Sequence, residues 1–223
     1  MGAISRSKSS TPGKPAGLVA ARVAELHELV RSDATGARDQ AWQWFRQAGR
    51  GLRSDRRAAM SELAALFAAG RPPAAIDGET QGALIGWAAA RVPDYLLTAL
   101  TDRWLPWAGK RFKAEQSTGD NVLPPNAKVA SKVLWPRYQM RSSGERLIGF
   151  DFTTYVQRGV LDTGTDVLVI DYASVESNPR LLIKQIRDEL VEVVPGANLG
   201  KMIYEGPGNR HTLLAYFALK SAL

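Results

Sequence analysis

The chain has 223 residues, of which 45% are hydrophobic and 23% are charged, and this composition predicts a packed core rather than a disordered protein. It contains no cysteine, which excludes thiolate nucleophiles, disulfides and cysteine-ligated zinc or iron–sulfur sites. The formal net charge is +7, so the protein carries a moderate excess of basic side chains.

The positive charge is concentrated in the first quarter of the chain. Residues 1–60 contain eleven basic and five acidic side chains, so they carry nearly all of the net charge. A clustered positive field attracts polyanions, which permits peripheral contact with nucleic acid or an anionic membrane through residues 1–60. A solvated helical face behind a flexible tail explains the same charges, and the interleaved acidic residues favour this second interpretation.

The N-terminus also bears on localisation. Residues 1–16 (MGAISRSKSSTPGKPA) lack the apolar run of a secretory signal. No stretch of the sequence reaches about 18 consecutive apolar residues. We therefore expect a cytoplasmic protein that does not cross a membrane.

The first part of the chain predicts a tail followed by helices. Residues 1–15 are rich in Ser, Lys, Gly and Pro and predict a disordered tail. Residues 16–71 form a helical region, in which apolar residues recur at helical spacing. This periodicity predicts amphipathic helices at about 18–31, 37–47 and 55–69.

Residues 76–223 predict a β-rich domain. Alternating or continuous apolar runs predict strands at 82–90, 146–157 and 166–172, and a hairpin of 198–205 with 210–220. The strand at 166–172 is apolar on both faces, which is typical of a strand covered from both sides.

Other parts of this region predict helix or irregular chain instead of strand. Helical signals predict a short helix at 93–104 and a long one at about 179–194, the latter from the spacing of Leu182, Ile186 and Leu190. Residues 105–145 predict irregular chain with an extended KVLW at 132–135. The fold class is therefore α+β: amphipathic N-terminal helices, then a curved antiparallel sheet or small open β-barrel with one long helix inserted.

The segment Trp104–Phe112 (WLPWAGKRF) combines large apolar rings with cations. Trp107 and Phe112 would contact the apolar body of a ligand, whereas Lys110 and Arg111 would bind an anionic head. The alternative is that the rings close one end of the core and the cations face water.

Three further residues are candidates. Asp171 and Tyr172 end the strand at 166–172, and a buried carboxylate there would need a partner such as Arg111 or Lys201. Alternation places Lys201 on the face of Leu199 and Ile203, where it either extends to an edge or points into a polar pocket. Asp171 is equally consistent with a structural ion pair or a turn residue.

Metal and cofactor motifs are missing from the sequence. It has no phosphate-binding loop, no dinucleotide-binding glycine pattern and no metalloprotease motif. Its two histidines, His27 and His211, have no neighbours at metal-ligand spacing. We expect neither a metal nor a cofactor.

The runs DGETQGALIGW (77–87), PWAGKRF (106–112) and the terminal FALK resemble uncharacterised actinobacterial proteins of the GXWXG type, over residues 76–220. Here Trp87 follows Gly86 rather than lying between two glycines, and Gly109–Phe112 is the better match. The resemblance implies a small β-barrel or strongly curved sheet whose interior takes a small apolar molecule. It implies no activity, so it assigns no catalytic residue.

These observations favour a non-catalytic protein that binds a small apolar or amphiphilic, lipid-like and anionic, molecule through Trp107, Lys110, Arg111, Phe112 and Lys201. Two alternatives stay open. One is a small-molecule lyase, isomerase or hydrolase that uses Asp171 as a base with Tyr172 or Lys201 assisting. The other is a nucleic-acid- or partner-binding protein that acts through its basic helices.

Overall fold

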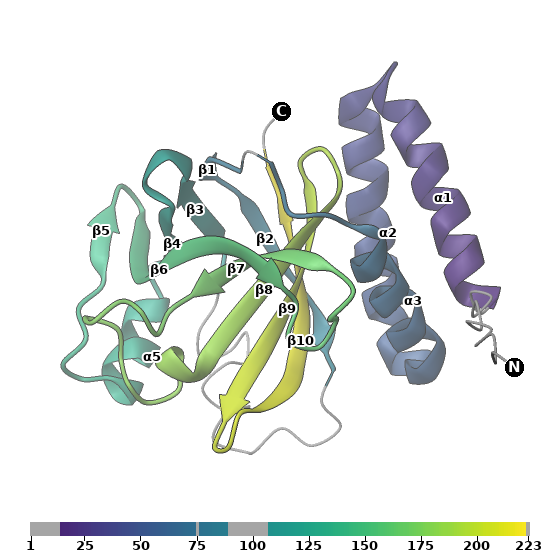
Figure 1. The fold of residues 1–223 in the computed structure, drawn as a ribbon. Coiled ribbons are helices and arrows are strands. Elements are labelled where there is room, and N and C mark those ends of the chain that lie inside the picture. Colours follow the sequence, from purple (N-terminus) through teal and green to yellow (C-terminus); the bar gives the residue numbers. More distant parts are fainter. Residues whose placement is uncertain (1–13, 75, 89–106, 222–223) are drawn as a thin grey trace, which may run out of the picture.

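A computed structural model describes residues 14–74, 76–88 and 107–221 (Figure 1). In these ranges, a layer of helices covers one face of a ten-stranded antiparallel sheet, and the sheet is nearly closed into a barrel. The predicted α+β class with a curved antiparallel sheet is therefore confirmed. None of the helices in the described part of the chain is long and apolar enough to cross a membrane.

The helical layer consists of α1 (Lys14–Val30), α2 (Ala34–Ser54) and α3 (Arg56–Ala69). Asp33 and Asp55 begin α2 and α3, because each carboxylate accepts a hydrogen bond from a backbone N–H of the first helical turn. The sequence predicted that α2 would end near Gly49, yet the helix continues to Ser54. A Cβ at position 49 would overlap the carbonyl oxygen of Ile85, so this glycine allows the helix to approach the sheet closely.

The sheet runs in the order β1-β3-β4-β6-β7-β8-β9-β10-β2, with β5 paired to β6 off this path. All of its pairings are antiparallel. The strands are β1 (Gly78–Glu79), β2 (Gln81–Trp87), β3 (Gly109–Lys113), β4 (Thr118–Leu123), β5 (Arg141–Ser143), β6 (Arg146–Arg158), β7 (Asp166–Asp171), β8 (Ile186–Val194), β9 (Ala197–Gly206) and β10 (Arg210–Lys220).

One stretch of chain, β1 together with β2, joins the two ends of the sheet. β1 pairs with β3, and β2 pairs with β10. Between these pairings, the Gly82 N–H donates to the Ala108 carbonyl at 2.6 Å. A Cβ at Gly82 would lie 2.7 Å from the Trp107 ring, so bare backbone is needed where the two ends of the sheet meet.

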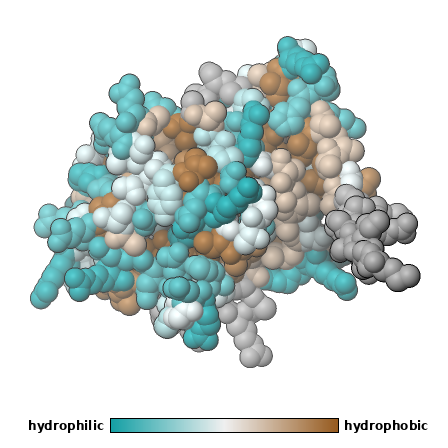
Figure 2. All heavy atoms as spheres, viewed as in Figure 1, coloured by the Kyte–Doolittle hydropathy of each residue, from teal (hydrophilic) through white to brown (hydrophobic). Residues whose placement is uncertain are grey.

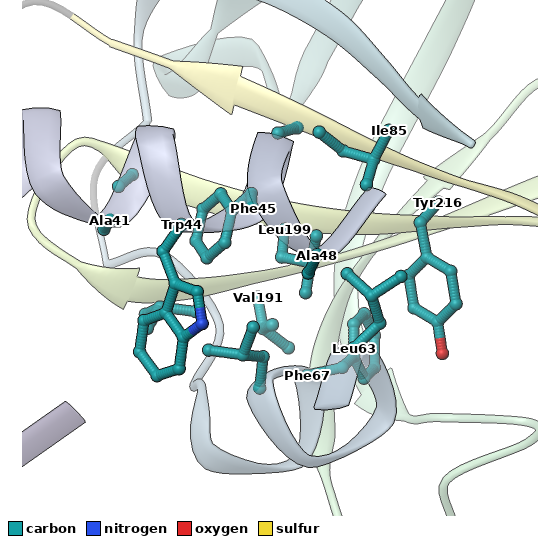
Figure 3. Close-up of a cluster of buried hydrophobic side chains, with 14 of the residues drawn as sticks. Ala41, Trp44, Phe45, Ala48, Leu63, Phe67, Ile85, Val191, Leu199 and Tyr216 are labelled. Carbon is teal, nitrogen blue, oxygen red and sulfur yellow. The ribbon is translucent and has the colours of Figure 1, made fainter. Parts of the chain in front are cut away.

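Two hydrophobic cores lie on opposite faces of the sheet. The helix-side core packs α1–α3 against the outer face of the barrel, and Figure 3 shows part of it. The barrel core lies inside the barrel. The residues labelled in Figure 3 are Ala41, Trp44, Phe45, Ala48, Leu63, Phe67, Ile85, Val191, Leu199 and Tyr216. Members of the barrel core include Phe112, Leu123, Phe150, Phe152, Leu168, Ile170, Tyr172, Ile186, Leu190 and Phe217.

Strand β7 lies between these two cores, and its successive residues alternate between them. Val167 and Val169 belong to the helix-side core, whereas Leu168 and Ile170 belong to the barrel core. The predicted double coverage of this strand is therefore confirmed. On the face seen in Figure 2, hydrophilic residues are widespread and apolar residues appear as smaller patches between them.

The long helix predicted at 179–194 is wrong. A single 3₁₀ turn, η2 (Ile183–Gln185), is followed by strand β8 (Ile186–Val194). The apolar residues of this segment fit a helical period, but they fit a strand buried on both faces equally well. The β-branched residues at its end and the two available cores favour the strand.

Two other predictions concern the segment between Ala88 and β6, and a third concerns the N-terminal tail. The extended KVLW is wrong, because residues Ala127–Leu134 form helix α5, which is followed by Trp135. The helix expected at 93–104 and the tail expected at 1–15 lie outside the described residues, except that α1 already begins at Lys14.

Strand β6 contains an irregularity that redirects a ring. Two of its residues, Phe150 and Asp151, lie opposite the single residue Asp120 of β4, which is a β-bulge. Phe150 has a φ of 52°, and its side chain lies in the barrel core. The bulge breaks the alternation predicted for this strand.

Candidate functional site

The barrel core contains a cavity of about 120 Å³. Most of its lining is aliphatic or aromatic. The apolar lining includes Leu84, Leu123, Ile183, Ile186, Met202 and Phe217. Polar atoms reach this cavity from a single cluster of side chains, the polar end, which consists of Trp107, Lys110, Asn121, Tyr172 and Asp188.

The polar end is built by residues that point inward from different strands. Lys110 of β3 lies opposite Asn121 of β4 in the sheet register. Asp188 comes from β8, and Tyr172 directly follows β7. Trp107 precedes β3 and contributes its indole N–H. Neighbouring strands thus bring together residues that are up to 81 positions apart, from 107 to 188.

The ammonium group of Lys110 is almost entirely buried, with 2% of the residue exposed. Its Nζ donates to Asn121 Oδ1 at 3.0 Å and to the Tyr172 hydroxyl, and it lies 2.9 Å from Asp188 Oδ2. An ammonium has three protons and no acceptor, so these three contacts satisfy it completely.

Aromatic rings surround the same ammonium. Nζ lies 5.1 Å from the ring centroid of Tyr172, 5.4 Å from those of Phe152 and Phe217, and 5.5 Å from that of Trp107. Distances below about 6 Å allow attraction between a cation and the ring faces. The rings therefore contribute to holding a charge that has lost its water.

The hydroxyl of Tyr172 links the other polar groups. It donates to Asp188 Oδ2 at 2.9 Å and accepts from Lys110 and from Asn121 Nδ2 at 3.3 Å. Burial and the negative charge of Asp188 raise the pKa of Tyr172 well above its ordinary value, because both disfavour the phenolate. Tyr172 is therefore a neutral donor at physiological pH.

Burial lowers the pKa of Lys110, since the charged form loses its hydration, and the carboxylate of Asp188 opposes this shift. Asn121 is held in turn by its own contacts. Its Nδ2 donates to the Phe150 carbonyl at 3.0 Å, and its Oδ1 also accepts from the Trp107 indole at 3.0 Å. The bulge at Phe150 thus helps to orient the amide that Lys110 binds.

Asp188 is the exception to this complete pairing. The residue is 4% exposed and lines the cavity. Its Oδ2 serves Lys110 and Tyr172, but its Oδ1 has no hydrogen-bond partner within the described part of the chain. A buried carboxylate oxygen without a partner is costly, so this oxygen is a hydrogen-bond acceptor that the polar end leaves unused.

Of the seven residues predicted from sequence, Trp107, Lys110 and Tyr172 line the cavity. Phe112 lies in the barrel core next to them and packs edge-on against Phe152, with ring centroids 5.4 Å apart. It supports the wall but is not part of the lining.

The structure places the other three predicted residues elsewhere, which corrects the expected site. Arg111 points out of the barrel and binds Asp120 through two hydrogen bonds of 2.8 and 3.1 Å. Asp171 Oδ1 accepts the Ala173 N–H at 2.8 Å and so caps a turn. Each is next in sequence to a cavity residue, and the strand pleat turns neighbours to opposite faces.

Lys201 lies on the helix side of the sheet. It shares the face of Leu199 and Ile203, and this face packs against the helices rather than the cavity. Its Nζ pairs with Asp162 and lies 4.2 Å from the ring centroid of Phe67 in α3. Neither Arg111 nor Lys201 contacts Asp171, contrary to the pairing considered from sequence.

The sequence reasoning missed Asn121 and Asp188. Asp188 lies in IRDELVEVV, and three consecutive charged residues made the segment resemble the solvent face of a helix. Asn121 lies in a stretch whose prolines suggested irregular chain. The only available signal was the alternation of β4, in which Asn121 shares a face with Leu123.

No protein-family model, no curated protein and no solved structure matches this chain. The resemblance to GXWXG-type proteins therefore stays a prediction.

Proposed function

We propose that the protein binds a small, mostly apolar molecule inside the barrel, with one polar group of the ligand at the polar end. The observation that carries the proposal is the lining of the cavity, which is apolar apart from one hydrogen-bonded cluster. Small-molecule sites typically combine an apolar wall with a few fixed polar groups that orient the ligand.

The size of the cavity supports this proposal. Its volume of about 120 Å³ is several times the roughly 10–15 Å³ that one water molecule needs. An engineered apolar cavity of about 150 Å³ in another protein takes up benzene. A compound with one six-membered ring is therefore a reasonable probe for this cavity.

The polar end is also preorganised. Lys110, Asn121 and Tyr172 hold one another through hydrogen bonds, so a ligand would meet groups that are already oriented. Binding to such a site loses little side-chain entropy, which favours affinity.

The alternative functions find less support in the structure. An enzyme based on Asp171 would need this carboxylate at the cavity, but Asp171 caps a turn instead. Several basic residues of the helices contact the protein itself: Arg22 lies over the Trp44 ring at 4.2 Å, and Arg56 donates to the carbonyls of Trp87 and Ala88. Because these contacts are intramolecular, they do not support a nucleic-acid or partner interface on the helices.

Titration with toluene tests the proposal, because toluene has an apolar body and no polar head. We expect saturable binding to the wild-type protein by calorimetry or by NMR shift changes of cavity methyl groups. The substitution Met202→Trp places a large ring in the cavity lining and is expected to abolish binding.

Val156→Trp is the matched control. Val156 lies on β6 with 59% of its surface exposed, so the same new ring there leaves the cavity open. Binding that is absent from the wild-type protein, or that survives Met202→Trp unchanged, would contradict a ligand site in the barrel.

A further inference from the structure

We infer that the ligand presents a neutral hydrogen-bond donor, such as a hydroxyl group, to Asp188, and not a carboxylate or phosphate. This inference rests on the proposed function and concerns the polar group of the ligand. It replaces the anionic head that the cations of the sequence suggested.

The charge of the polar end carries the first step. Among the described residues that line the cavity, Lys110 and Asp188 are the charged ones, and their side chains pair at 2.9 Å. Arg111 and Lys201, which would have made the cavity positive, bind Asp120 and Asp162 on the other face of the sheet. The polar end is therefore close to electrically neutral.

The donors of the polar end carry the second step. All three ammonium protons of Lys110 have acceptors in Asn121, Tyr172 and Asp188. The Tyr172 hydroxyl donates its single proton to Asp188 Oδ2, and the Trp107 indole donates to Asn121 Oδ1. An anion would have to displace one of these contacts to find a donor.

The free acceptor carries the third step. Asp188 Oδ1 is the oxygen that the network leaves over, and Asp188 lines the cavity. A ligand hydroxyl that reaches this buried oxygen would break none of the hydrogen bonds of the polar end, and hydrogen bonds to a charged acceptor are stronger than neutral ones. A ligand carboxylate would instead meet a buried carboxylate, with repulsion that the low polarity of the barrel strengthens.

Three compounds with the same ring and different heads test this inference: toluene, benzyl alcohol and benzoate. We expect benzyl alcohol to bind the wild-type protein at least about tenfold more tightly than toluene, and benzoate to bind more weakly than either. The dissociation constants are measured by calorimetry at pH 7, where benzoate is ionised.

Asp188→Asn removes the negative charge of the polar end and so leaves it with a net positive charge. Lys110 then keeps Asn121 and Tyr172 as acceptors, but its charge loses its counterion. We expect benzoate to bind this variant at least about tenfold more tightly than it binds the wild-type protein, and benzyl alcohol to lose its advantage over toluene.

The double variant Lys110→Met with Asp188→Leu removes both charges and keeps an apolar interior of similar volume, so it keeps the test open if the single variant does not fold. It should bind toluene as the wild-type protein does, without preferring benzyl alcohol. Equal binding of toluene and benzyl alcohol to the wild-type protein, or tightest binding of benzoate, overturns the inference but leaves the proposed function. Failure of all three compounds to bind overturns both.

Discussion

The two buried lysines among the described residues lie in contrasting surroundings on opposite faces of one sheet. Lys110 and Lys201 are 2% and 3% exposed, each pairs with one aspartate, and each lies near aromatic rings. Lys110 lies at a cavity and has three acceptors, whereas Lys201 packs between β9 and Phe67 of α3.

This difference separates Lys110, which belongs to the candidate site, from Lys201, which is buried by packing between the sheet and the helices. The aspartate of Lys201, Asp162, keeps 19% of its side chain exposed and so retains part of its hydration. Asp188 keeps 6%, and its remaining oxygen has no partner in the residues that the structure describes. A buried lysine therefore marks a candidate site only where its counterion also has capacity left and space beside it.

The largest expected effect separates the two ion pairs. Asp188→Ala leaves the buried ammonium of Lys110 without its counterion, and we expect it to lower the free energy of unfolding by about 3–5 kcal/mol. Asp162→Ala is the matched change at Lys201. It should cost about 1–2 kcal/mol, because Asp162 is partly solvated and Glu189 lies opposite Lys201 in the β8–β9 register.

Urea denaturation at pH 7 measures both values. If the two variants lose equal stability, the two lysines are energetically equivalent and Lys110 is not set apart by its surroundings.

A second, smaller effect concerns the space next to Lys110. Gly200 of β9 lies opposite Phe217 of β10, and a Cβ at position 200 would overlap the Phe217 ring. Gly200→Ala is therefore expected to push this ring toward the cavity, to cost about 1–3 kcal/mol of stability and to weaken toluene binding at least tenfold.

Gly164→Ala provides the control, since a Cβ at Gly164 meets open space. Unchanged toluene binding by Gly200→Ala would show that Phe217 yields in another direction.

The smallest effect is a dependence on alkaline pH that both regions share. Tyr172 in the barrel and Tyr216 in the helix-side core both have a raised pKa, because burial disfavours the phenolate and a nearby aspartate adds to the shift. Above about pH 10 the unfolded chain loses these protons while the folded protein keeps them, so the folded protein becomes less stable as the pH rises.

Tyr172→Phe removes one of the two groups. The free energy of unfolding of this variant should therefore fall less steeply between pH 9 and 11 than that of the wild-type protein, measured by denaturation at each pH. Tyr155→Phe is the control, because Tyr155 is 42% exposed. Identical slopes for the wild-type protein and Tyr172→Phe would contradict the buried, neutral state of Tyr172.

Local sequence signals located part of the site. Lys110 was found because a cation next to several aromatic residues is unusual, and Tyr172 because it ends an apolar strand. Asp188 was missed for a specific reason: in IRDELVEVV the apolar residues fit both a helix and a doubly buried strand, and the helix turned its charges toward solvent. The error in secondary structure was therefore also the error in the site.

Sequence patterns alone predicted the helical front, the double coverage of β7, the C-terminal hairpin and the α+β class. Each of these depends on neighbours within a few residues. The tertiary structure alone decided which of the two buried faces encloses a cavity, and hence that Lys110 and Asp188 meet there while Arg111 and Lys201 do not. The physical reason is that alternation sorts the residues of a strand into two faces, but when helices cover one face and the barrel encloses the other, both are buried and the pattern does not distinguish them.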